Sequence, residues 1–131
     1  MIALDTSALV AMALEEAEAE AFAEAIARNG AEVGTPTLLE TRMVLSSRLS
    51  DEGHGFMNAL LRRASIQAVA FTLDMHAAAV DAFARYGRGR GHPAQLNFGD
   101  CMAYAVARHR DLPLLFKGGN FALTDIRPAL A

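Results

Sequence analysis

The chain has 131 residues, of which 53% are hydrophobic, and carries a formal net charge of −3. This length suits one domain over residues 1–131 that buries its own core, and the negative charge argues against indiscriminate binding to nucleic acid. The single cysteine excludes an internal disulfide, and neither a basic leader nor an apolar run of roughly 18 residues is present, so we expect a cytoplasmic protein that does not enter a membrane.

Short apolar runs alternate with helical patterns along the chain. The apolar runs predict strands over residues 1–4, 31–34, 66–71 and 112–116. The helical patterns predict helices over residues 8–14, 15–29, 37–50, 55–64, 75–86 and 98–107. Buried strands that alternate with helices favour an α/β fold in which both faces of a parallel sheet are covered.

Polar residues at the start of several helices are typical N-caps. Thr6 or Ser7 can cap the first helix, and Asp74 can cap the helix that ends near residue 86. Asn97 can cap the helix over 98–107, with Asp100 in its first turn. The rest of that last helix is apolar on nearly every side, so we expect it to lie in the interior with an acidic tip.

Four polar side chains follow predicted strands or open the helices beside them: Asp5, Glu40, Asp100 and Asn120. Ligands of an open parallel sheet bind beyond the carboxyl ends of its strands, so these four residues are expected to share one rim. Converging carboxylates repel one another unless a cation lies among them. Oxygen ligands favour Mg²⁺ or Mn²⁺, and such ions commonly meet phosphates. The pattern therefore points to phosphodiester or phosphoryl chemistry.

A purely structural interpretation is available for the same acids. Asp5 can simply cap the helix that follows it, and the sequence from Thr37 to Glu40 matches a capping box. Asn97 and Asp100 allow a similar account. Three unrelated helix starts that place acids after strands favour a metal site, but the pattern alone leaves both interpretations open.

The charge is uneven along the chain, because residues 1–52 carry −7 and residues 53–131 carry +4. An anionic ligand is therefore expected to approach through the second part. Arg85, Arg88 and Arg90 lie in or beside a glycine-rich segment just before Asp100, and Lys117 follows the last strand. We predict that these four basic residues contact the phosphates of such a ligand. Alternatively, the arginines belong to a solvated loop that binds no ligand. Lys117 could instead neutralise the cluster of acids at the rim of the sheet.

Several segments together resemble the PIN-domain ribonucleases of the VapC toxin family. They are Ile2–Leu9, Thr35–Glu40, Leu96–Ala105, and Leu114–Gly118 through Thr124–Ile126. The resemblance covers nearly the whole chain, and it implies a PIN-like three-layer α/β/α sandwich with a central parallel sheet. It also implies Mg²⁺-dependent endonucleolytic cleavage of RNA, with Mn²⁺ as a substitute ion.

The resemblance further implies a role for each acid. Asp5 and Asp100 match the family's metal-binding acids, and Glu40 is the third member of the acidic pocket. Relatives usually carry an acid just before the phenylalanine of the Lys-Gly loop, where this chain has Asn120. Asn120 is therefore expected to be a neutral fourth member that binds a second metal ion less tightly.

The implied biological role is that of the toxin in a type II toxin–antitoxin pair. The partners would be a cognate VapB-type antitoxin and a second copy of the chain in a homodimer. Two other functions remain open from the sequence. One is a catalytically weakened PIN-fold protein that binds RNA or antitoxin, and the other is a receiver-type phosphoacceptor domain, which would have no role for Asp100.

Overall fold

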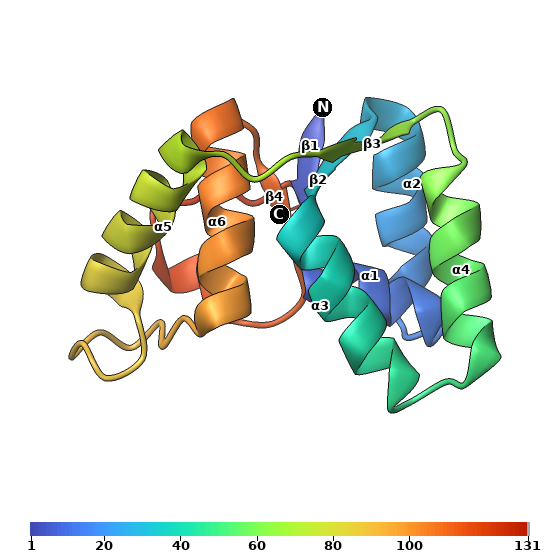
Figure 1. The fold of residues 1–131 in the computed structure, drawn as a ribbon, viewed down its shortest axis with the longest axis horizontal. Helices are drawn as coiled ribbons and strands as arrows, with labels where there is room; N and C mark the ends of the chain where they lie inside the picture. Colours follow the sequence, from blue (N-terminus) through green and yellow to red (C-terminus); the bar gives the residue numbers. More distant parts are fainter. Residues whose placement is uncertain (131) are drawn as a thin grey trace.

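A four-stranded parallel sheet with the strand order β3-β2-β1-β4 lies at the centre of the chain. Its strands are β1 (Ile2–Leu4), β2 (Ala31–Gly34), β3 (Ile66–Val69) and β4 (Leu114–Leu115). The helices are α1 (Thr6–Ala13), α2 (Ala19–Asn29), α3 (Thr35–Ser46), α4 (Asp51–Leu61), α5 (Leu73–Tyr86), α6 (Phe98–Arg110) and the 3₁₀ helix η1 (Phe121–Leu123). The computed structural model describes residues 1–130 and is drawn in Figure 1.

Two apolar cores lie on opposite faces of the sheet. Ile2 and Leu4 belong to the core formed with α1, α2, α3 and α4, whereas Ala3 between them belongs to the core formed with α5 and α6. This alternation follows from the two-residue period of a strand. Figure 1 shows α5 and α6 side by side, apart from the other four helices. The predicted three-layer α/β/α architecture with a parallel sheet is confirmed.

The strand order explains both the layers and the place of the site. From β1 to β2 to β3 each connection steps one strand in the same direction, so right-handed crossovers put α1 to α4 on one face. The connection from β3 to β4 returns across the sheet and puts α5 and α6 on the other face. The direction of winding reverses between β1 and β4, and a reversal of this kind opens a crevice at the carboxyl ends of those strands.

Helix α6 lies in the interior, as its sequence predicts. Its buried residues are Cys101, Ala103, Tyr104, Ala105, Val106 and Ala107. The alanines let α6 lie close to the sheet, and Gly34 at the end of β2 contributes to this approach. A Cβ atom at position 34 would lie 2.7 Å from Cγ2 of Val106. No helix among residues 1–130 is both long enough and apolar enough to span a bilayer.

Several predicted boundaries and caps are wrong. Helix α2 begins at Ala19 instead of residue 15, because Glu15 adopts a positive φ of 54° in the turn after α1. The cap of α1 is Asp5, not Thr6 or Ser7. Thr72, not Asp74, caps α5, since the Thr72 side chain accepts a hydrogen bond from the Met75 amide.

Other elements are shifted or shorter than predicted. Helix α3 runs over 35–46 instead of 37–50, because Pro36 is tolerated in a first helical turn, where backbone N–H groups have no partner. Helix α4 runs over 51–61 instead of 55–64, and α6 continues to residue 110. The third and fourth strands are shorter than predicted, covering 66–69 and 114–115.

Candidate functional site

Asp5 lies directly after β1, and only 3% of its surface is exposed. Its Oδ2 atom accepts hydrogen bonds from the Ser7 amide (3.0 Å) and the Ser7 hydroxyl (2.6 Å), which cap α1. Its backbone amide donates to the carbonyl of Leu115 in β4 (3.0 Å). The other carboxylate oxygen, Oδ1, is buried and has no hydrogen-bond partner. One half of this carboxylate is therefore fixed, and the other half is free to bind a ligand.

Ser7 connects the ends of the two central strands. Its hydroxyl donates to Asp5 and accepts a hydrogen bond at 2.9 Å from the backbone amide of Lys117, which follows β4. The same oxygen thus fixes the orientation of the Asp5 carboxylate and holds the loop after β4 against it. The sequence placed Ser7 at this helix start but could not reveal the contact with Lys117, which lies 110 residues away.

Asp100 and Asn97 form the capping box that the sequence allows. The Asp100 amide donates to Oδ1 of Asn97 (2.8 Å), and the Asn97 amide donates to Oδ2 of Asp100 (3.0 Å). The two hydrogen bonds fix the Asp100 side chain at the first turn of α6. Asp100 nevertheless lines the pocket that Asp5 lines. The structural and functional interpretations of this acid are therefore compatible.

A pocket of about 260 Å³ lies at the carboxyl ends of β1 and β4. It is lined by Asp5, Ser7, Asn97, Asp100, Lys117, Gly118, Gly119, Asn120 and Phe121. The structure thus brings together Asp5, Asp100 and Asn120 from segments that are far apart in the sequence. The glycines after Lys117 leave one side of the pocket without bulky side chains.

Glu40 lies beside this pocket instead of lining it. Helix α3 begins at Thr35, so Glu40 is in its second turn, and α3 has no side-chain cap. The predicted capping box from Thr37 to Glu40 is therefore wrong. The Thr6 hydroxyl instead donates to Oε1 of Glu40 at 2.5 Å. A side chain at position 99 would collide with the Glu40 carboxylate, so Gly99 allows the start of α6 to lie against this acid.

The three acids influence one another electrostatically. Burial raises the pKa of Asp5 to about 6. The hydrogen bonds from Ser7 lower this pKa, whereas the negative charges of Asp100 and Glu40 raise it further. Burial also raises the pKa of Asp100, with a further contribution from Glu40, although the Asn97 amide and Arg88 oppose it. These shifts are the expected signature of carboxylates gathered without enough neighbouring positive charge.

The donors in the pocket fit a hard divalent cation that keeps part of its water shell. Within residues 1–130, no three side chains of His, Cys, Asp or Glu are close enough in this geometry to hold an ion by themselves. Asp5 offers an unpartnered buried oxygen, Asp100 offers a carboxylate, and Asn120 offers an amide oxygen. Mg²⁺ binds such sites through one or two carboxylates and several waters.

Two of the four predicted phosphate-binding residues already have acidic partners. The Lys117 ammonium pairs with Glu16 (2.9 Å) and Glu18 (3.3 Å) in the turn between α1 and α2, so it neutralises these acids instead of Asp5 and Asp100. Arg85 pairs with Asp81 and Asp125, both at 3.3 Å. These pairs hold both cations to neighbouring elements of the protein.

Arg85 belongs to a network around Asp125 that ties the end of the chain to α5 and α6. The Tyr104 hydroxyl donates to Oδ1 of Asp125 (2.7 Å), and Arg108 pairs with Oδ2 (3.2 Å). The Asp125 amide donates to the Tyr86 hydroxyl (3.2 Å). Asp125 is thus held by its protein partners and is not among the residues that line the pocket between Asp5 and Asp100.

The other two predicted residues, Arg88 and Arg90, lie in the loop between α5 and α6. The Arg88 charge is close enough to Asp100 to favour its ionised form. The Arg90 guanidinium lies over the Phe83 ring, 5.4 Å from its centroid. Arg88 is therefore the predicted phosphate contact whose charge acts on an acid of the pocket.

Comparisons with known proteins identify a family and structures that this chain resembles. The PIN domain family model matches residues 2–126. Ribonuclease VapC of Mycolicibacterium smegmatis is 44% identical over 124 residues, which are 94% of this chain and 95% of that protein. The crystal structure of Mycobacterium tuberculosis VapC20, described as a Sarcin-Ricin loop cleaving toxin, matches with a TM-score of 0.77 at 18% identity and covers 96% of both chains. VapBC2 from Rickettsia felis, bound to a DNA fragment from its promoter, matches with a TM-score of 0.75 at 14% identity, covering 98% of this chain and 96% of that one.

Replacing Asp5 by asparagine tests the electrostatics of the pocket. The raised pKa of Asp5 means that the folded chain binds this proton more tightly than the unfolded chain does. The resulting stabilisation is complete below pH 3.8 and is lost as the pH rises through about 6. In EDTA, Asp5→Asn is therefore expected to flatten this dependence and to stabilise the fold at pH 7.5 by up to about 3 kcal/mol.

Thermal unfolding of the metal-free proteins at pH 4.5, 6.0 and 7.5 measures this effect. Asp74→Asn is the matched control, because Asp74 is an exposed acid at the start of α5. It is expected to unfold like the unmodified protein at all three pH values. If the unfolding temperatures of Asp5→Asn and of the unmodified protein depended on pH in the same way, the interpretation that burial and neighbouring charges raise the pKa of Asp5 would be contradicted.

Proposed function

The chain belongs to the PIN-domain family as a ribonuclease of the VapC type, and from this membership we propose that its acidic pocket hydrolyses RNA with the help of Mg²⁺. The protein is an endoribonuclease and the toxin of a toxin–antitoxin pair. The observation that carries the metal proposal is the unpartnered buried Oδ1 atom of Asp5 in the pocket that Asp100 also lines. The receiver-type alternative is wrong, because the family match covers residues 2–126.

Asp5 and Asp100 are the proposed metal ligands. Ser7 orients one and Asn97 orients the other through hydrogen bonds that leave oxygen atoms toward the pocket. When bound, Mg²⁺ or Mn²⁺ would neutralise charge at the scissile phosphate and lower the pKa of a water molecule. The protein's own contribution is to hold the two carboxylates rigidly, so that no reorganisation is needed when RNA arrives.

Glu40 and Asn120 have proposed supporting roles. The Glu40 carboxylate, held by Thr6 and lying against Gly99, adds negative charge that attracts the cation and can accept a hydrogen bond from its water shell. Asn120 contributes a neutral amide oxygen from the loop after β4. Because it brings no charge, it is expected to bind an ion more weakly than a carboxylate would.

The proposed partners follow from the same assignment. RNA is the substrate, and a cognate VapB-type antitoxin silences the enzyme. We place this activity in the cytoplasm and assign it to residues 1–131 acting as a single domain. Arg88 and Arg90 are the better placed of the predicted phosphate contacts, because Arg85 and Lys117 are held in ion pairs.

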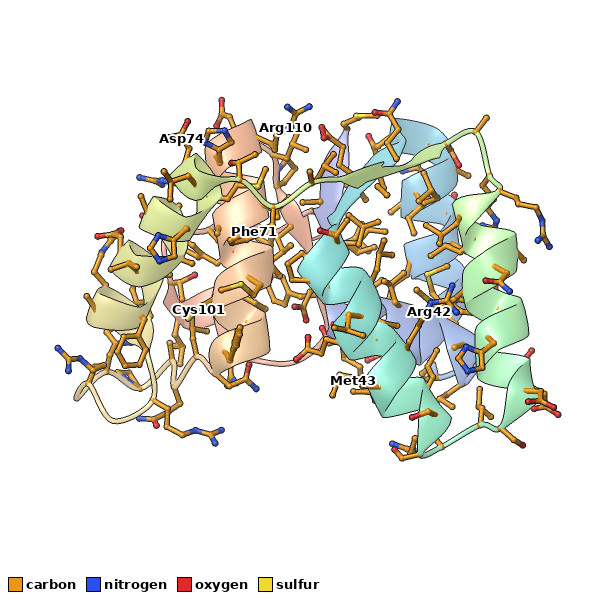
Figure 2. All side chains as sticks on the ribbon, viewed as in Figure 1. Arg42, Met43, Phe71, Asp74, Cys101 and Arg110 are labelled. Carbon is orange, nitrogen blue, oxygen red and sulfur yellow. The ribbon has the colours of Figure 1, made fainter. Side chains whose placement is uncertain are left out.

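A homodimer is proposed through the outer side of α3. Leu39 and Met43 are 62% and 64% exposed, and Figure 2 shows Met43 at the edge of the molecule. They line a groove of about 320 Å³ together with residues at the start of α6, namely Phe98, Gly99 and Met102. Exposed apolar side chains that gather in one place mark association surfaces, and a two-fold axis would let each copy cover the other.

Light scattering of the purified protein tests this association. The expected mass is twice that of one 14.0 kDa chain, and the variant Met43→Glu is expected to reduce it to that of one chain. Leu123→Glu is the matched control, since Leu123 is also exposed but lies in η1. A mass of one chain for the unmodified protein would contradict the homodimer.

Cleavage of total bacterial RNA by antitoxin-free protein tests the main proposal. Discrete cuts are expected with Mg²⁺ or Mn²⁺, no cuts with EDTA, and a loss of at least roughly 100-fold in rate for Asp100→Asn, which removes a proposed ligand charge. Each divalent ion is also expected to raise the unfolding temperature of the unmodified protein, and less so that of Asp100→Asn.

The two measurements together separate the alternatives. Stabilisation by the ion without any cutting would favour the catalytically weakened PIN-fold protein that binds RNA or antitoxin. Cutting that persists in EDTA, or in Asp100→Asn at an unchanged rate, would contradict the metal mechanism.

Asn120→Asp tests the neutral member of the pocket. A third charge near Asp5 and Asp100 is expected to lower the Mg²⁺ concentration for half-maximal cleavage by roughly 10-fold. Thermal unfolding against Mg²⁺ concentration is expected to show the same direction. The control is Asn120→Ala, which lacks any oxygen ligand in its side chain and should require more Mg²⁺ than the unmodified protein. An unchanged Mg²⁺ requirement in both variants would exclude residue 120 from the site.

A further inference from the structure

Lys117 is the basic residue among those that line the acidic pocket, but its ammonium group is bound elsewhere. Its backbone amide donates to the Ser7 hydroxyl in the first turn of α1. Its side chain reaches the turn that follows α1, where the ammonium lies 2.9 Å from Oε1 of Glu16 and 3.3 Å from Oε1 of Glu18. The charge of Lys117 is therefore held by the turn after α1 and not by the acids of the pocket.

The turn that holds this charge is itself fixed to the helices on either side of it. The Glu16 amide donates to the Ala11 carbonyl in α1 (2.9 Å), and the Glu16 carbonyl accepts a hydrogen bond from the Ala19 amide at the start of α2 (2.9 Å). The Oε1 atom of Glu18 is buried and accepts no hydrogen bond, so it depends on the nearby Lys117 ammonium for compensation. The backbone and the charges thus define one place for the ammonium group.

The three charged side chains attract one another at a partly shielded site. They are between 33% and 39% exposed, so solvent screens their attraction less than it would at an open surface. The hydrogen bond to Glu16 raises the pKa of Lys117, with a smaller contribution from Glu18, so Lys117 is a cation at neutral pH. Two acids around one ammonium group hold it more firmly than either acid would alone.

Without these partners the ammonium group would be within reach of the pocket. Only the Ser7 hydroxyl separates the Lys117 amide from Oδ2 of Asp5, through hydrogen bonds of 2.9 and 2.6 Å, and a flexible four-carbon side chain can span that gap. A Cβ atom at Gly118 or Gly119 would contact nothing within 4 Å, so the side of the pocket next to Lys117 is open. The unpartnered Oδ1 atom of Asp5 can accept a hydrogen bond from an ammonium group. A released Lys117 would therefore compete with a metal ion for the same carboxylate.

We propose that Glu16 and Glu18 set the affinity of the acidic pocket for its metal ion, because they hold the Lys117 ammonium away from Asp5 and Asp100. This inference rests on the proposed metal-dependent function and adds two positioning residues to it. Both act through Lys117 and touch neither the ion nor RNA. An ammonium group in the pocket would neutralise the carboxylates, and a divalent ion would then have to displace it before binding.

Binding of Mn²⁺ to the purified protein tests this inference without catalysis, since bound Mn²⁺ is lost from the EPR signal of the free ion. The variant Glu16→Gln/Glu18→Gln removes both charges and is expected to raise the Kd for Mn²⁺ about fivefold. Addition of Lys117→Met to this variant is expected to restore the Kd of the unmodified protein, because the competing charge is then absent.

Glu15→Gln/Glu20→Gln is the matched control. Glu15 and Glu20 are exposed acids of the same segment, and neither forms an ion pair within residues 1–130. This variant changes the net charge by the same amount and is expected to bind Mn²⁺ like the unmodified protein. An equal loss of affinity in the control would reveal a general effect of net charge and would overturn the inference. A loss that persists after Lys117→Met would also overturn it.

A crystal structure of metal-free Glu16→Gln/Glu18→Gln tests the position of the charge directly. The Lys117 Nζ atom is expected within about 4 Å of a carboxylate oxygen of Asp5 or Asp100. An ammonium group that stays beside residues 16 and 18, or that points into solvent, would overturn the inference. Equal Mn²⁺ affinity of the unmodified protein and this variant would overturn the inference alone. Failure of the unmodified protein to bind Mn²⁺ would overturn the proposed metal site as well.

Discussion

The position of Asp5 at the point where the sheet reverses its winding is the constraint on which the rest of the site depends. One oxygen of its carboxylate caps α1 through Ser7, and Ser7 in turn receives the amide of Lys117 after β4. These hydrogen bonds hold the ends of the two central strands together and leave the second oxygen buried without a partner. The same contacts that complete the fold therefore also orient the carboxylate that we propose as a metal ligand.

Asp100 follows the same logic from the opposite layer. Its capping box with Asn97 begins α6, whose apolar interior positions fix the helix against the sheet. Gly99, between these two residues, lets the helix start approach Glu40 on α3. A cap and a ligand are often treated as competing explanations for an acid at a helix start. In this chain the cap gives the proposed metal ligand a fixed orientation.

The sequence predicts the layers and most of the site because those features depend on local patterns. Strand runs, helical periodicity and acids after strands are sufficient to place Asp5, Asp100 and Asn120 at one rim. The capping box that the sequence allows for Glu40 is wrong, because the start of α3 at Thr35 depends on tertiary packing around Gly34. The partners of Lys117, Glu16 and Glu18, lie about 100 residues away, and no local pattern predicts such a pair.

Stability and function oppose each other in the acidic pocket. Burial and mutual repulsion raise the pKa values of Asp5 and Asp100, so their ionised forms cost the metal-free fold free energy at neutral pH. A divalent cation at the proposed site would remove this cost by pairing with the same charges, and metal binding would then be linked to folding. A pocket with a third carboxylate at position 120 would bind the ion more tightly but would repel more strongly without it. In the proposed site, the neutral Asn120 therefore favours the stability of the metal-free protein at the expense of affinity for the ion.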